Sequence, residues 1–124
     1  MAAHGADEHR RRTDGFGRFA EALCRLELRL KGYRIVAQRL RTPLGEIDIV
    51  AKRGQTLAVV EVKARGDWLT ASESVTARQR GRLARAAHVF LGANPQYAGL
   101  SLRFDVMLVT PWAFPRHLKD AWRL

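Results

Sequence analysis

One apolar run that ends in charged residues constrains this chain more than any other feature. Residues 57–60 read LAVV, and Glu61 and Lys63 follow almost at once. A short run of mostly branched apolar residues, without polar alternation, is typical of a central strand that is covered on both faces. The run therefore favours an α/β fold, in which helices pack against the sheet that contains this strand.

The rest of the chain alternates between helical and extended patterns. We expect, in order, a helix at 14–31, strands at 33–40, 45–52 and 56–64, a helix at 74–93 and a strand at 101–109. Ser72 or Ser74 is the expected cap of the second helix. Residues 111–124 read as a tail. The predicted order is α-β-β-β-α-β, which describes a mixed sheet in a single α/β domain.

The first helix has a clear amphipathic pattern. Its core-facing stripe is predicted to be Phe16, Phe19, Ala20, Leu23, Leu26 and Leu30. A helical wheel places Glu21 nearly opposite Leu23, so Glu21 faces solvent unless the helix also packs on a second side.

Length and composition point to one domain in a reducing compartment. The chain has 124 residues, which suits a folded domain at 14–124 preceded by a flexible basic arm at 1–13. The single cysteine, Cys24, excludes an intramolecular disulfide. We find no apolar stretch of the ~18 residues that a membrane span needs and no signal peptide, so a cytoplasmic location is expected.

The charge indicates a polyanionic partner. The 22 Lys and Arg residues, against 12 Asp and Glu, give a formal charge of +10, and most of the cations are Arg. Nucleic acid is the first candidate, an anionic membrane the second, and a general Arg bias without a specific partner the third. Arg78, Arg82 and Arg85 form one stripe on the second predicted helix, which suits either a phosphate backbone or a solvated face.

Alternation within strands brings several charged side chains together. Glu46 and Asp48 share one strand face, as do Glu61 and Lys63. A two-residue loop at 54–55 would place Asp48 opposite Glu61, whereas a loop at 53–54 would place Glu46 there. All four side chains stay on one face in either register.

This cluster has a catalytic and a structural interpretation. Opposed carboxylates repel each other, and a divalent cation such as Mg²⁺ or Mn²⁺ would resolve the conflict, with Asp48 and Glu61 as its ligands. Lys63 would then orient or deprotonate a water that attacks a phosphodiester, or offset charge that develops on the phosphate. Alternatively, the same residues form cross-strand ion pairs on a solvated face.

Two segments resemble a known family. The sequence GEIDIVA at 45–51 is followed, 13 residues after Asp48, by EVKAR at 61–65. With Glu21 in the first helix and Arg103-Phe104-Asp105 in the last strand, this pattern resembles the YraN family of uncharacterised bacterial proteins. That family is similar to the archaeal Holliday-junction resolvases and has a restriction-endonuclease-like fold, so the resemblance implies that fold from about residue 17 to residue 122.

The resemblance also implies a site. Asp48 and Glu61 would bind metal, Lys63 would assist catalysis, Glu21 would complete the metal shell, and Gln79 matches a resolvase site residue. Ala20 departs from the pattern, because many members have Gly there.

Further expectations concern partners and structure. Arg65, directly after the triplet, joins the Arg stripe as an expected nucleic-acid contact. Asp105, between two apolar residues, is interpreted as a buried structural acceptor. A homodimer is expected by analogy with junction resolvases, which pair two sites to cut two strands.

Three function classes remain. The first is a Mg²⁺- or Mn²⁺-dependent endonuclease that acts on structured or branched DNA. The second is a non-catalytic, basic nucleic-acid-binding accessory in DNA uptake, repair or recombination. The third is a protein-interaction or membrane-surface module. The strand carboxylates separate the first class from the others, because binding alone has no use for Asp48 or Glu61.

Overall fold

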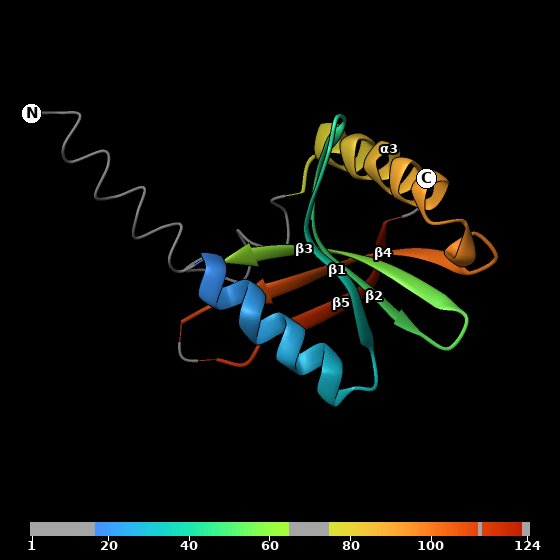
Figure 1. Cartoon of the computed structure of the whole chain (residues 1–124). Coiled ribbons are helices and arrows are strands. Elements are labelled where there is room, and N and C mark those ends of the chain that lie inside the picture. Colours follow the sequence, from blue (N-terminus) through green and yellow to red (C-terminus); the bar gives the residue numbers. More distant parts are fainter. Residues whose placement is uncertain (1–16, 65–74, 112, 123–124) are drawn as a thin grey trace, which may run out of the picture.

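The computed structural model describes residues 17–64, 75–111 and 113–122, which form one sheet with two helices packed on it (Figure 1). The five-stranded mixed sheet has the order β1-β2-β3-β4-β5. The elements are the helix at 17–30, β1 (Arg34–Thr42), β2 (Gly45–Arg53), β3 (Thr56–Ala64), α3 (Ala77–Ala93), the short 3-10 helix η1 (Pro95–Tyr97), β4 (Ser101–Val109) and β5 (Arg116–Trp122). The predicted single α/β domain and its order of elements are confirmed, and β5 is an additional strand.

The turn between β2 and β3 sets the register of the sheet centre. The loop consists of residues 54–55, and Arg53 pairs with Thr56 across it. Gly54 has a φ of 59°, a left-handed conformation that glycine adopts without a steric penalty. This is the first of the two predicted registers, and it directs Asp48 towards Glu61.

The strand β3 lies at the centre and is covered on both faces. It pairs antiparallel with β2 and parallel with β4, and the connection from β3 to β4 runs through α3. Val59 packs into the cluster beneath α3, whereas Val60 packs into the cluster beneath the N-terminal helix. The two helices accordingly lie on opposite sides of the sheet (Figure 1). The interpretation of the apolar run is confirmed.

The N-terminal helix packs through a different face from the predicted one. Ala20, Cys24 and Leu28 are fully buried against the sheet, whereas Phe19 and Leu30 are exposed. The small side chains of Ala20 and Cys24 leave room for the helix to lie close to the strands. The prediction was right for Ala20 and wrong for Phe19 and Leu30, because helical spacing identifies an apolar stripe but not the face that the sheet accepts. Phe16 and the arm at 1–13 lie outside the described residues.

The start of α3 and the C-terminal segment also differ from the predictions. Thr76, rather than Ser72 or Ser74, caps α3, in a reciprocal capping box with Gln79. The predicted tail instead contains β5, whose Trp122 stacks on Phe104 of β4. A register shift in the pairing of β4 with β5 and a φ of 53° at Asp120 interrupt the alternation that marks a strand in a sequence.

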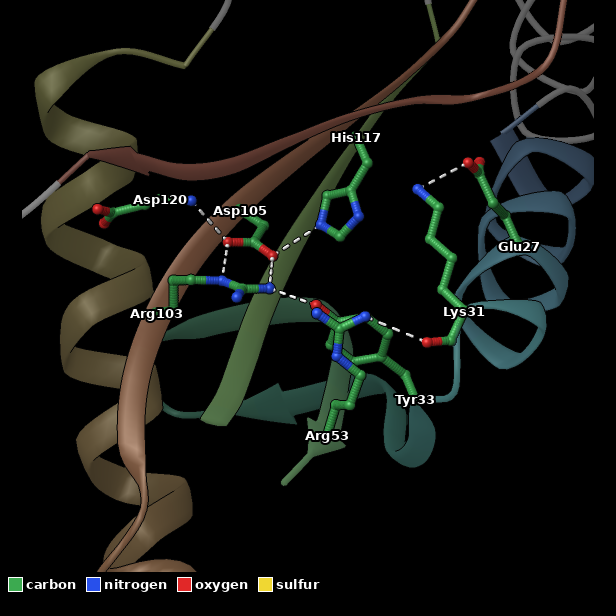
Figure 2. Close-up of polar contacts among 8 residues, drawn as sticks. All are labelled: Glu27, Lys31, Tyr33, Arg53, Arg103, Asp105, His117 and Asp120. Carbon is green, nitrogen blue, oxygen red and sulfur yellow. Dashed lines mark hydrogen bonds and ion pairs between the residues drawn. The ribbon is translucent and has the colours of Figure 1, made fainter. Parts of the chain in front are cut away.

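A buried polar network ties β5 to β4. Figure 2 shows Asp105 accepting hydrogen bonds from Arg103 Nε (2.8 Å) and from the Asp120 backbone N–H (2.9 Å), while its Oδ2 lies 2.7 Å from His117 Nε2. These partners hold the pKa of Asp105 below its usual value, although burial alone would raise it. Arg103 also donates to the Tyr33 hydroxyl. The interpretation of Asp105 as a buried structural acceptor is confirmed.

Candidate carboxylate site and cationic surface

The site lies where β2 separates from β3. The paired residues of β2 and β3 run from Arg53 and Thr56 to Ile49 and Val60, after which β3 continues beside β4. Asp48 is the first β2 residue past this pairing. Its Oδ2 accepts a hydrogen bond of 2.9 Å from the backbone N–H of Val62, so the side chain takes the place of a strand partner.

Glu61 and Lys63 complete the centre from β3. The Lys63 Nζ lies 3.4 Å from Glu61 Oε1, and the Lys63 side chain is only 9% exposed. The carboxyl groups of Asp48 and Glu61 lie close enough for each to change the pKa of the other. The structure therefore brings three of the predicted site residues together. The alternative, in which these residues form ion pairs on a solvated face, is wrong because Lys63 is buried.

The electrostatics of the pair are unfavourable for two negative charges. Burial, and then the charge of Glu61, raise the pKa of Asp48 to about 7 from its usual 3.8, against the Val62 hydrogen bond that lowers it. Burial also raises the pKa of Glu61, although the Lys63 ammonium opposes this shift. The charge of one lysine thus offsets the charge of these two part-buried acids only in part. The site is suited to a further cation or to a proton.

Glu21 reaches this region because its helix packs on the sheet through the row of Ala20, Cys24 and Leu28, which lies next to Glu21. Its carboxylate Oε2 accepts a hydrogen bond of 2.7 Å from Arg39 Nε, and its charge raises the pKa of both Asp48 and Glu61. The alternative in which Glu21 faces solvent is therefore wrong, since its side chain is only 12% exposed. Its predicted role as a metal ligand stays a prediction, and the partner that the structure gives it is Arg39.

Arg39 is the residue that sequence reasoning missed. It lies between Gln38 and Leu40, which pair with Ile49 and Ile47 of β2, so it stands opposite Asp48. Its φ of 48° is unusual for a residue with a side chain. The register shift near the start of β1 precedes this position. No pattern in the sequence marks it, because one cation among many in a strand carries no signal of backbone conformation.

The other predicted residues lie around the centre or outside it. Glu46 is exposed and pairs with Arg41 of β1. The Gln79 side chain accepts a hydrogen bond of 2.9 Å from the Thr76 backbone N–H, so it stabilises the start of α3. Arg65 lies outside the described residues.

The predicted Arg stripe is present on α3. Arg78, Arg82 and Arg85 are all exposed. A cleft of about 410 Å³ lies between α3 and the turn from β1 to β2, and it is lined by Arg82, Arg41 and Glu46 among others. The cationic surface therefore consists of the α3 stripe together with Arg41 of β1. It extends from α3 towards β2, the strand that carries Asp48.

The donor set limits the metals that fit. The described part of the chain holds no group of three or more His, Cys, Asp or Glu side chains arranged for a metal ion. Two part-buried carboxylates that repel each other are nevertheless the donor set that Mg²⁺ accepts, because this ion keeps several waters and binds substrate phosphate oxygens. Asp48 and Glu61 fit such an ion, whereas the described residues do not fit a closed zinc site.

The fold and the site together define a class of protein. It is a single α/β domain with two part-buried carboxylates and a buried lysine where β2 separates from β3, and with an arginine-rich helix over one face of the mixed sheet. No helix within the described ranges is long and apolar enough to cross a membrane.

The family model described as uncharacterised protein family UPF0102 matches residues 20–109. A UPF0102 protein of Parvibaculum lavamentivorans is 61% identical over 104 residues, which cover 84% of this chain and 78% of that protein. Another, from Paramagnetospirillum magneticum, is 47% identical over 126 residues, covering 98% and 93% of the two chains. The chain belongs to the UPF0102 (YraN) family, as the sequence motifs indicated.

Proposed function

We propose that this protein is a Mg²⁺- or Mn²⁺-dependent endonuclease that hydrolyses phosphodiester bonds in structured or branched DNA. The observation that supports this most is the proximity of Asp48 to Glu61, which forms an ion pair with the buried Lys63. Two part-buried acids beside a buried amine, near the end of a central strand, have no evident structural purpose. Their arrangement agrees with the Asp, then Glu-x-Lys, pattern of the restriction-endonuclease-like fold.

Asp48 and Glu61 are the residues that would hold the cation. The Val62 amide fixes Asp48 by donating to its Oδ2. A cation between Asp48 and Glu61 would replace the hydrogen bond between the two carboxyl groups. When bound, the cation would polarise the phosphodiester and lower the pKa of a coordinated water. It would also return the pKa of both acids towards their usual values, because it supplies the positive charge that the pair lacks.

Lys63 is the proposed catalytic amine. Its ammonium is held 3.4 Å from Glu61 and almost out of solvent. In that position it orients the attacking water through a hydrogen bond and stabilises negative charge that develops on the phosphate oxygens. Burial strengthens both effects, because water does not screen the charge there.

Arg39 and Glu21 lie beside the centre formed by Asp48, Glu61 and Lys63. The ion pair of 2.7 Å between them fixes the guanidinium of Arg39 on the β1 side of Asp48. The Arg39 side chain is 44% exposed, so it remains accessible to a phosphate. The α3 stripe would bind the backbone farther along the nucleic acid without reading its sequence.

A second candidate function is nucleic-acid binding without catalysis. The exposed arginines of α3 favour it, because they suit a phosphate backbone whether or not the carboxylates react. In this case the protein would act as an accessory in DNA uptake, repair or recombination.

A cleavage assay separates the two candidates. The substrates are linear duplex, single-stranded, flap and four-way-junction DNA with Mg²⁺ or Mn²⁺, and the proteins are wild type, Glu61→Ala and Lys63→Ala. We expect wild type to cut a branched substrate and both variants to lose at least about 100-fold in rate. Glu46→Gln is the matched control, since Glu46 is exposed. Binding by all proteins without cleavage by any would reject the nuclease and favour the accessory.

A further inference from the structure

The N-terminal helix carries a second apolar stripe that its own sheet does not use. Phe19, Leu23, Leu26 and Leu30 lie within about 60° of one another on a helix of 3.6 residues per turn. Three of them are largely exposed, with exposed fractions of 60% for Phe19, 51% for Leu26 and 79% for Leu30. The buried face of the same helix is the separate row through Cys24. The helix is therefore apolar on two sides.

The stripe continues into an apolar groove. This groove has a volume of about 600 Å³ and is lined by Phe19 and Leu23 of the helix, by residues around Pro111 after β4, and by Phe114. Phe114 lines the groove and is nevertheless 84% exposed. Four of the six exposed large hydrophobic residues of the described chain thus belong to this one surface, while Leu44 and Val89 lie elsewhere.

The size of the surface matches what a stable dimer needs. At their exposed fractions, Phe19, Leu26, Leu30 and Phe114 offer roughly 500 Å² of apolar area. A standard interface buries about 800 Å² on each partner, of which about 56–65% is apolar, or roughly 450–520 Å². An apolar patch of this extent on a water-facing helix marks an interaction site.

We propose that this surface binds a second copy of the same chain. The spacing of four, three and four residues along the stripe is that of a helix that packs lengthwise against another helix. A twofold axis would pair the stripe with itself, because a twofold interface joins the same patch on both subunits. Each protomer then brings one exposed Phe114 and one groove, so both can be filled by symmetry.

A polyanion does not explain the same surface. The cations of this helix, Arg18, Arg25 and Arg29, lie on a separate side from the stripe, and phosphates would leave its leucines exposed. The dimer does not depend on catalysis. It would, however, hold two carboxylate sites in a fixed relation, because Glu21 is on the same helix as the stripe.

The test is the mass of the full chain in solution. Sedimentation or light scattering should give twice the 14.0 kDa of one chain at micromolar concentration. Leu26→Glu/Leu30→Glu should weaken dimerisation at least about 100-fold, since each added charge enters the interface twice. The matched control is Leu44→Glu/Val89→Glu, which changes the net charge equally at two exposed hydrophobic residues outside the surface. Circular dichroism reports whether each variant is folded.

A dimer that only Leu26→Glu/Leu30→Glu dissociates into folded monomers would support the proposal. A wild type that is monomeric at every concentration would overturn it, and would assign the surface to residues 1–16 of the same chain or to another partner. A dimer that survives this variant, or that the control disrupts equally, would also overturn it. A monomer that binds anionic vesicles through the stripe would identify a membrane as the occupant instead.

Discussion

At the scale of single residues, Asp48 shows how local geometry and burial change the ionisation of a carboxyl group. Its carboxylate replaces a strand partner by accepting from the Val62 amide, and the adjacent Glu61 opposes its ionisation. Sequence alone predicted that Asp48, Glu61 and Lys63 would gather, because strand alternation and one two-residue loop determine their positions. It could not predict Arg39, since neither the left-handed backbone at this residue nor its ion pair with Glu21 follows from periodicity.

The raised pKa of Asp48 predicts a stability that falls with increasing pH. Between the usual 3.8 and the folded value of about 7, the folded protein binds more protons than the unfolded chain. The free energy of unfolding therefore decreases as the pH rises through this range, and between pH 5 and pH 8 the decrease is about 1–3 kcal/mol in the absence of divalent cations. Asp48→Asn keeps an oxygen for the Val62 amide and removes this titration, so it should be more stable than wild type at pH 8.

Urea unfolding at pH 5 and pH 8, with a chelator present, measures this difference. Glu46→Gln serves as the control, because it removes a carboxylate from an exposed position of the same strand. An equal pH dependence in wild type and Asp48→Asn would show that Asp48 ionises normally in the folded protein, and its raised pKa would then be wrong.

At the scale of elements, the sequence predicted where helices and strands begin and end better than which of their faces is buried. The bounds of β3 and β4 agree with the sequence pattern, because apolar runs and glycine turns mark strands clearly. The predicted face of the N-terminal helix was right at Ala20 but wrong at Phe19 and Leu30, since periodicity identifies every apolar stripe but not the one that the sheet accepts. Thr76 was missed as the cap because Ser72 and Ser74 have the same chemistry. The strand β5 was missed because an irregular pairing interrupts its alternation.

The stripe on α3 predicts how nucleic-acid binding responds to salt. Replacing Arg78, Arg82 and Arg85 by Gln should weaken binding to duplex DNA and reduce the slope of log K against log salt by up to about 2.7, because about 0.9 is lost per phosphate contact. The loss should be similar for unrelated sequences, since phosphate contacts do not read bases. Fluorescence anisotropy at several salt concentrations measures the slope.

The N-terminal helix offers a control of equal charge. Arg18, Arg25 and Arg29 lie on the opposite side of the sheet from α3, and their replacement by Gln lowers the net charge by the same amount. If both triple variants lose the same slope, the effect belongs to net charge rather than to the α3 surface. An unchanged slope in the α3 variant would leave the stripe as solvated surface.

At the scale of the whole molecule, one sheet separates three surfaces. The carboxylate centre lies where β2 leaves β3. The helix α3, which carries the exposed arginines, covers one face of the sheet, and the N-terminal helix, which carries the apolar stripe, covers the other (Figure 1). The network of Asp105 fastens β5 to β4 in the interior (Figure 2). The proposed nucleic acid and the proposed second subunit would therefore not compete for the same side chains.

The central claim is that the pair Asp48 and Glu61 accepts a divalent cation, and this can be tested without knowing the substrate. A ligand that binds only the folded state stabilises it by about 2.7 kcal/mol at one hundred times its Kd. The test is the melting temperature of wild type, Asp48→Asn and Glu46→Gln at pH 8, with and without Mg²⁺ or Mn²⁺. We predict a rise of several degrees in wild type and Glu46→Gln and little or none in Asp48→Asn. Equal rises in all three proteins, or no rise in wild type, would contradict the proposed cation site.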